Sequence, residues 1–131
     1  WIVQKLTELG VDRIQLLHAR RSVVRWDGPR AGRHMSRLRT VAREALRQSR
    51  GVWLPEILGP VDAREVLSDA AVAEPGGDAL ARERPTVLIG PEGGWTSDEL
   101  DLAPHRVDLG DTVLRVETAA LTAAARLVAL R

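Results

Sequence analysis

The stretch TVLIGPEGGWTSDELDLAPHRVDLGDTVLRVETA, residues 86–119, decides the fold of this chain. Residues 86–89 are apolar and rich in β-branched side chains, a pattern typical of a short buried parallel strand. The loop that follows, residues 90–94, places three glycines and a proline at the carboxyl end of that strand. Open α/β sheets bind ligands at this edge, although a tight turn is the structural alternative. The spacing matches neither G-x-G-x-x-G nor the phosphate-binding loop, so a dinucleotide or triphosphate is not expected.

The rest of this stretch predicts a short helix, a strand and a final helix. Thr96 and Glu99 have capping-box spacing, which predicts a helix that ends near residue 103, before Pro104. A strand is expected at residues 105–109, and the last helix at residues 118–130. Because the last helix is apolar on most faces, we expect it to pack against a second subunit as well as its own sheet.

The first 85 residues continue the alternation of helical and strand patterns. The expected features, in chain order, are helix 2–9 with Gly10 as its C-terminal stop, strand 13–17, turn 27–32, helix 33–50, strand 52–55, a helix that starts at Asp62, and a loop or poor strand at 71–85. The buried stripe expected on helix 33–50 consists of Met35, Leu38, Val41, Ala42, Ala45 and Leu46. Strands that alternate with helices predict an α/β fold with a mainly parallel sheet flanked by helices.

Composition narrows the class of protein. At 131 residues, 44% hydrophobic and 28% charged, the chain has the size and balance of one soluble domain. With zero cysteines it has no disulfides or thiolate metal sites, and a cytoplasmic location is expected. The three histidines lack a partner four residues away, so no metal is expected, and no apolar run approaches membrane-spanning length. The chain starts with Trp1 inside an apparent helix, which suggests a fragment of a longer protein.

Charge is distributed unevenly along the sequence. Residues 20–50 contain ten arginines against Asp27 and Glu44, a local charge of +8 in a chain whose net charge is +1. Such asymmetry favours a surface that faces a polyanion, and nucleic acid is the expected partner. The structural alternative is a solvated helix face.

Five motifs occur in one order: QKLTELGV (4–11), RSVVR (21–25), EALRQS (44–49) with PEI (55–57), IGPEGGWT (89–96) and LG..VLRVETAAL (109–121). Together they resemble the SPOUT superfamily of RNA methyltransferases, and in particular the RsmE family, which methylates N3 of a uridine in 16S ribosomal RNA. The resemblance implies an α/β domain with a C-terminal trefoil knot, an exception to the usual absence of knots. It also implies a homodimer with active sites at the subunit interface, and an additional N-terminal RNA-binding barrel domain that residues 1–131 do not contain.

The same resemblance implies S-adenosylmethionine (SAM) as cofactor, bound among three loops. These loops comprise Ile89, Gly90, Pro91, Glu92, Gly93 and Gly94; Leu109 and Gly110; and Leu114, Arg115, Val116, Glu117, Thr118 and Ala119. Several members have structural alternatives. Arg115 could instead pair with an acid of the knot, Thr118 could be the N-cap of the last helix, and Glu92 could brace its loop. Trp95 could stack on a base or on adenine, or it could cover the core.

Methylation of N3 requires that the N3 proton leave, so a proton acceptor or a cation that stabilises the uracil anion is needed. Arg21 is the first candidate for the cation or for holding a phosphate, against the alternative of a surface arginine. The other catalytic candidates are Glu44, for which a structural ion pair is the alternative, and Glu117, for which helix capping is. The RNA-binding candidates are Arg20, Arg21, Ser22, Arg43, Arg47, Gln48 and Arg50. Two positions depart from the family: Gly51 stands where relatives often carry arginine, and Arg20 where an acid is common.

The sequence thus predicts a SAM-dependent methyltransferase that acts on a 16S rRNA uridine of the small ribosomal subunit, as a cytoplasmic homodimer without metal or membrane. A knotted ribose 2′-O-methyltransferase is one alternative. A non-catalytic RNA-binding or ribosome-assembly module is another.

Overall fold

Helices and strands alternate along the computed structural model, which describes residues 1–26 and 28–131. The elements are α1 (Ile2–Leu9), β1 (Arg13–His18), α2 (Gly28–Ser49), β2 (Glu56–Asp62), the short 3-10 turns η1 (Ala63–Glu65) and η2 (Leu67–Asp69), β3 (Ala71–Asp78), β4 (Val87–Leu88), α3 (Ser97–Asp101), β5 (His105–Val107) and α4 (Val116–Ala129). The predicted α/β class is confirmed.

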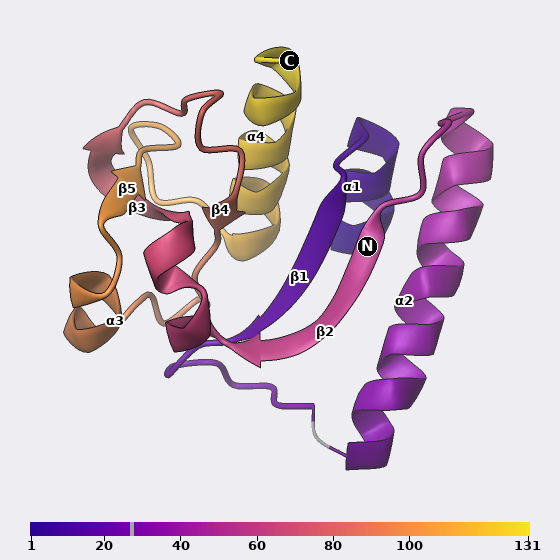
Figure 1. Ribbon diagram of the computed structural model, residues 1–131, viewed down its shortest axis with the longest axis horizontal. Helices are drawn as coiled ribbons and strands as arrows, with labels where there is room; N and C mark the ends of the chain where they lie inside the picture. Colours follow the sequence, from indigo (N-terminus) through magenta and orange to yellow (C-terminus); the bar gives the residue numbers. More distant parts are fainter. Residues whose placement is uncertain (27) are drawn as a thin grey trace.

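All of the strand pairs are parallel, and they form two sheets (Figure 1). In one sheet β1 pairs with β2, with Ile14 opposite Ile57. In the other, β3 lies between β4 and β5, so that Ala71 is opposite both Val87 and His105. Parallel pairing brings the carboxyl ends of β4 and β5 to the same edge, where the loops of the candidate site begin.

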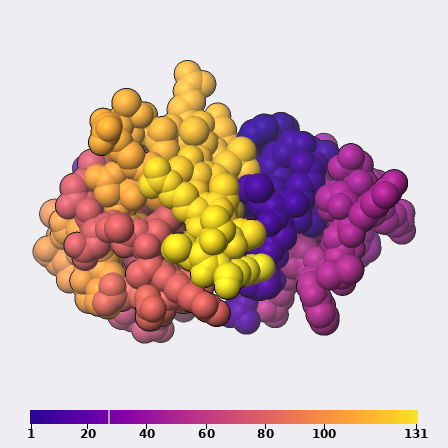
Figure 2. All heavy atoms as spheres, turned by 90° about the horizontal axis from the view of Figure 1, so that it is seen from above, coloured from indigo at the N-terminus to yellow at the C-terminus, as the bar shows by residue number. Residues whose placement is uncertain are grey.

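The helices pack against one another and against the sheets. α1 packs against both α2 and α4, and Figure 2 shows α1 and α4 side by side. The core beside β1 and β2 contains Val3 from α1 and Met35 and Ala42 from α2. A second core, beneath β3 and β4, contains Leu67 and Val72, both 0% exposed. Apolar stripes at helical spacing account for the first core, as expected from the sequence.

α2 begins at Gly28, five residues before the predicted start, so the turn expected over residues 28–32 is wrong. Pro29 lies in the first turn of the helix, where its missing N–H costs no intrahelical hydrogen bond. Asp27, the first residue of the predicted turn, lies outside the described residues. The buried stripe was predicted correctly, because Met35, Ala42 and Ala45 are buried.

The strand predicted at residues 52–55 is wrong, since β2 starts at Glu56. Pro55 lacks an N–H, and pairing with β1 begins at the next residue, where Glu56 lies opposite Arg13. The segment before it is exposed instead: Val52 is 83% and Trp53 81% accessible. Residues 71–85 contain a real strand, β3, interrupted by a change of register between Ala73 and Asp78 around two glycines.

Other local signals give mixed outcomes. Gly10 ends α1 in the left-handed conformation, as predicted. Asp62 does cap a turn, accepting a bond from the Arg64 N–H at 3.0 Å, but the turn is the three-residue η1 and no α-helix follows it. α3 ends at Asp101 rather than near residue 103.

Candidate functional site

The three loops singled out by the sequence meet at one apolar cluster. Leu109, Ala119 and Ala123 are its buried members, and Ile89 and Leu114 pack against them. Each loop thus contributes at least one apolar anchor. The cluster lies where β4 and β5 end and α4 begins, the edge at which parallel sheets bind ligands.

The glycine loop, residues 90–94, is a tight turn closed by a 2.8 Å hydrogen bond from the Gly94 N–H to the Pro91 carbonyl. Gly94 has a φ of +71°, a backbone conformation that residues with a side chain rarely adopt. Gly90 is confined differently, because a β-carbon there would lie 2.8 Å from Nε1 of Trp95. Glu92 and Gly93 are exposed at the tip of the turn. Glycine is therefore required at two of the three positions, for two different reasons.

Trp95 lies beneath this loop and is 6% exposed, in the same core as Leu88 and Ala103. The interpretation of Trp95 as a cover for the core is confirmed. The alternative, stacking on a base, is wrong because no free ring face remains. Its Nε1 is buried without a hydrogen-bond partner in the part of the chain that the structure describes.

Arg21 joins the RSVVR motif, residues 21–25, to the glycine loop. Its Nη1 donates to the Gly93 carbonyl at 2.8 Å and to the Trp95 carbonyl at 3.4 Å. Its neighbour Ser22 accepts a 3.0 Å bond from the Ala19 N–H, which fixes the turn that carries both arginines. A guanidinium has five N–H donors, so Arg21 keeps donors for an anion while it holds the loop.

Glu99 also holds the turn that carries Arg20 and Arg21. Its buried carboxylate, in a side chain that is 2% exposed, accepts bonds from the Arg20 N–H at 2.8 Å and the Thr96 N–H at 2.9 Å. Burial raises the pKa of Glu99, but these amide bonds outweigh it and lower the pKa below its ordinary value. The predicted capping box is confirmed. Its spacing gave no sign that Glu99 also holds Arg20, 79 residues away.

The second loop, Leu109 and Gly110, is fixed by Asp108, which the sequence interpretation did not select. Asp108 accepts a 2.7 Å bond from the Gly110 N–H and a 2.8 Å bond from the Gly76 N–H. These bonds lower the pKa of the Asp108 carboxyl. Gly110 has a φ of +139°, so glycine suits the turn. The signal in the sequence that could have identified Asp108 is its position directly before Leu109 and Gly110.

The third loop leads into α4, whose N-cap is Arg115. Thr118 is therefore not the N-cap, and no side chain caps the first turn. Glu117 lies in that turn, where the helix dipole favours an acid, but it does not act as a cap. Arg115 forms no ion pair with any described carboxylate, so the alternative in which it pairs with an acid of this chain is not observed. Val116 is half-buried beside these polar side chains.

The remaining candidates lie on or just after α2, at the side of the β1–β2 sheet away from β4 and α3 (Figure 1). Glu44 is exposed and has no ion-pair partner among residues 1–26 and 28–131, so the structural pairing expected for it is wrong. Within one copy of the chain these residues do not reach the three loops. They are Arg43, Glu44, Arg47, Gln48 and Arg50, all of them exposed.

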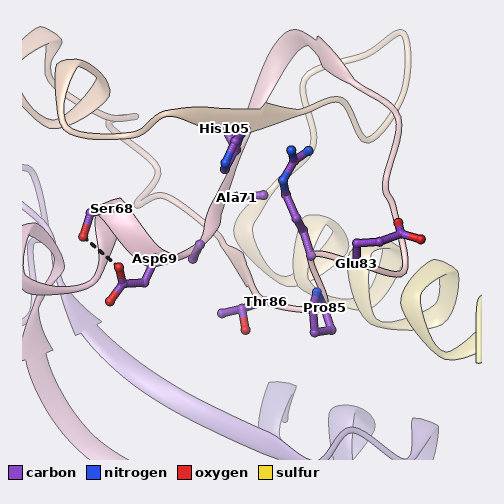
Figure 3. Close-up of a pocket in the computed structure, with 9 residues that line it drawn as sticks. Ser68, Asp69, Ala71, Glu83, Pro85, Thr86 and His105 are labelled. Carbon is purple, nitrogen blue, oxygen red and sulfur yellow. Dashed lines mark hydrogen bonds between the residues drawn. The ribbon is translucent and has the colours of Figure 1, made fainter.

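A separate cavity of about 200 Å³ lies at the opposite edge of the second sheet (Figure 3). It lies at the start of β3 and β5, with Ala71, Thr86 and His105 in its wall, and Ser68 donates to Asp69 beside it. Over the described ranges, no three His, Cys, Asp or Glu side chains are grouped to hold a metal ion. None of the helices there is long and apolar enough to cross a bilayer.

Fold and site together define an α/β domain in which three loops meet at one apolar cluster, where β4 and β5 end and α4 begins. The chain belongs to the RNA methyltransferase domain family, whose family model matches residues 1–128. The resemblance to the RsmE family is confirmed by curated relatives. Ribosomal RNA small subunit methyltransferase E of Mycobacterium bovis is 35% identical to this chain. The alignment is 142 residues long and includes 92% of this chain and 54% of the relative. The protein of that name from Bacillus subtilis is 29% identical, over 94% of this chain and 57% of its own length. The chain thus spans about half the length of the curated relatives it matches.

Solved structures agree with this assignment. Ribosomal RNA small subunit methyltransferase E from Neisseria gonorrhoeae, bound to SAM, superposes with a TM-score of 0.85 at 30% identity, over 98% of this chain and 59% of that one. A Legionella pneumophila protein in complex with SAM gives a TM-score of 0.88 at 29% identity, over 98% and 59% of the two chains.

Proposed function

We propose that this chain is the SAM-dependent catalytic domain of an rRNA methyltransferase that modifies N3 of a uridine in 16S rRNA of the small ribosomal subunit. The observation that carries the proposal is the meeting of three loops at one apolar cluster through Ile89, Leu109 and Leu114. A relative that matches this chain over most of its length is named for rRNA methylation, and a structural neighbour was solved with SAM bound.

The loops leave room for a ligand to approach the backbone closely. A β-carbon placed on Gly94 or Gly110 would meet no atom within 4 Å, so open space lies beside both positive-φ glycines. The proposed cofactor residues are those of the three loops, Ile89–Gly94, Leu109–Gly110 and Leu114–Ala119. Their backbone N–H and carbonyl groups would hold the ligand, while Ile89 and Leu114 supply apolar contact.

SAM, when bound, supplies an electrophilic methyl group on a sulfonium whose leaving group is a neutral thioether. What the chain must do is hold the uracil and manage its N3 proton. Arg21, already anchored on Gly93, keeps N–H donors that would stabilise the uracil anion or a neighbouring phosphate. Glu117, in the first turn of α4, and Glu44 are the proposed proton acceptors.

A homodimer is part of this proposal. Within one copy, Glu44 and the basic residues of α2 lie apart from the three loops, so a second copy would have to bring them there. Apolar side chains that flank α4 support such an interface, since Val113 is 91% and Leu130 40% exposed. A cytoplasmic location and the trefoil knot implied by the resemblance belong to the same proposal.

The test is calorimetric titration with SAM, followed by methyl transfer from labelled SAM to 16S rRNA, both as free RNA and as assembled small subunits. Binding of SAM and transfer to one uridine are the expected results. N3 methylation blocks Watson–Crick pairing and stops reverse transcription at that base, whereas a ribose 2′-O-methyl group leaves pairing intact. RNA binding without SAM binding at millimolar cofactor would point to a non-catalytic assembly module and contradict the proposal.

A further inference from the structure

An exposed apolar segment lies at the end of the arginine-rich helix. Residues 52–54 connect α2 to β2, and Trp53 is 81% exposed although a large aromatic side chain normally gains from burial. Leu54 is 47% exposed and lines a groove of about 360 Å³ between α2 and β2. This volume lies near the lower end of ligand-binding sites, at roughly 300–1,000 Å³.

The groove is basic at one wall and apolar at the other. Arg39 and Arg43 come from α2, and Arg39 donates to the Ile57 carbonyl at 3.4 Å, which holds it across the groove. The one acid in the lining, Glu56, is paired with Arg13 at 2.8 Å. Its charge is therefore compensated, and the arginines dominate the groove.

The whole of α2 carries uncompensated positive charge. It contains six arginines against the single acid Glu44, and all six are exposed: Arg30, Arg33, Arg37, Arg39, Arg43 and Arg47. None of them forms an ion pair with a carboxylate in the described part of the chain. The arginines of α2, which have no carboxylate partner in that part of the chain, are followed by an exposed tryptophan in the next connection. These are the two elements of single-strand binding, a charged track and a stacking ring.

We propose that the segment around Trp53 and the groove lined by Arg39 and Arg43 form a docking platform for single-stranded RNA, with a base stacked on the Trp53 indole and phosphates on the two arginines. The inference rests on the proposed function, because it assigns part of the RNA surface. It adds Trp53 and Arg39, which lie outside the three loops and outside the predicted RNA-binding set, to Arg43, which already belongs to that set. α2 has 22 residues and is about 33 Å long, so an RNA strand that follows it spans about ten stacked nucleotides.

The experiment measures binding of a fluorescein-labelled 15-nucleotide single-stranded RNA by anisotropy. Trp53→Ala is expected to weaken binding roughly tenfold, within the range for loss of one stacked base. Trp53→Phe is expected to keep most of the affinity, and Trp53→Leu is not, since leucine lacks a ring face. Trp1→Ala is the matched control, because Trp1 is also exposed, at 66%, but lies at the start of α1 and not in the connection between α2 and β2.

The arginines have a separate readout. Arg39→Ala and Arg43→Ala are each expected to lower the slope of log affinity against log salt by about 0.7, the value for one single-strand phosphate contact. Wild-type affinity in Trp53→Ala, or equal affinity of the Leu and Phe variants, would overturn the platform. So would self-association of the chain that depends on Trp53, which would mark a protein interface, or absence of RNA binding by the unchanged chain.

Calorimetry with SAM separates the two proposals. The Trp53 variants are expected to bind SAM as the unchanged chain does, because Trp53 lies neither in the three loops nor among the basic residues of α2 that the proposed dimer brings to them. RNA binding that depends on Trp53 without any SAM binding would keep the platform and refute the enzyme. SAM binding with RNA affinity indifferent to Trp53 would do the reverse.

Discussion

The guanidinium of Arg21 donates a 2.8 Å hydrogen bond to the carbonyl oxygen of Gly93, 72 residues further along the chain. This contact fastens the loop after β1 to the glycine loop after β4. A β-carbon on Gly93 would lie 3.2 Å from Cβ of Arg21, so the two backbones are also close in space. Arg21 therefore has a structural role in the candidate site besides the chemical one that we propose.

Arg21→Ala is expected to weaken SAM binding about fivefold. It removes the exposed hydrogen bond to the Gly93 carbonyl, which contributes roughly 1 kcal/mol to holding the glycine loop in place. Arg21→Lys keeps the charge but loses the planar fork, so it should recover only part of the affinity. Calorimetry measures both, with Arg25→Ala as a control at an exposed arginine of the same motif. Equal loss in the control would show that bulk charge, and not the Gly93 contact, sets the affinity.

Gly90→Ala is expected to destabilise the fold by about 1–3 kcal/mol, the usual cost of overpacking. The added methyl group would press on Nε1 of Trp95 at 2.8 Å. The cost should fall in a Trp95→Phe background, which removes that nitrogen. Urea unfolding of the two single variants and the double variant measures the coupling. Gly59→Ala is the control, since a β-carbon there meets nothing within 4 Å; strict additivity at positions 90 and 95 would contradict the packing described.

The sequence predicted what local interactions determine. Gly10 as a helix stop and the capping box of Thr96 and Glu99 depend on residues three or four apart, and the structure confirms both. The start of β2 depends on a partner strand 43 residues away, where Arg13 pairs with Glu56, so apolar residues 52–55 gave the wrong strand. Periodicity identifies residues that can form a strand, but pairing decides which ones do.

The candidate site divides in the same way. The glycines of the loops could be recognised from their spacing, and the structure brings their apolar neighbours into one cluster. The groups that fix the loops could not be recognised in this way. Glu99 accepts a hydrogen bond from Arg20, 79 residues away, and Asp108 accepts one from Gly76, 32 residues away. An isolated carboxylate in a sequence carries no sign of which backbone amide it will meet.

Asp108→Asn is expected to loosen the second loop and lower SAM affinity severalfold. A carboxylate accepts from the Gly76 and Gly110 N–H groups at once, whereas an asparagine side chain has one carbonyl oxygen for the two donors. The matched control is Asp111→Asn, an exposed acid three residues on. SAM calorimetry at neutral pH checks both variants. Unchanged affinity in Asp108→Asn would show that Leu109 and Gly110 do not depend on this anchor.

Glu99→Gln is expected to cost about 1–3 kcal/mol of unfolding free energy at neutral pH, because buried amide donors lose a charged acceptor. The pKa of Glu99 is lower in the folded chain than in the unfolded one. Its stabilising contribution is therefore complete above the unfolded pKa and is lost as pH falls through the folded pKa. Urea unfolding of both proteins from pH 7 to pH 3 measures this directly. The gap between them should be widest near neutrality and should close in acid.

Two further measurements make that result specific to the Arg20 contact. Glu83→Gln removes an exposed carboxylate and should shift stability by less than about 0.5 kcal/mol, with no change in pH dependence. Hydrogen exchange at the Arg20 amide should accelerate in Glu99→Gln, since that N–H loses its 2.8 Å carboxylate acceptor. A Glu99→Gln protein whose stability runs parallel to the wild type across the whole pH range would mean that Glu99 is not ionised in the fold. In that case the turn that carries Arg20 and Arg21 would be held by packing and by the hydrogen bond between Ala19 and Ser22, and the glycine loop would keep its position without the buried charge.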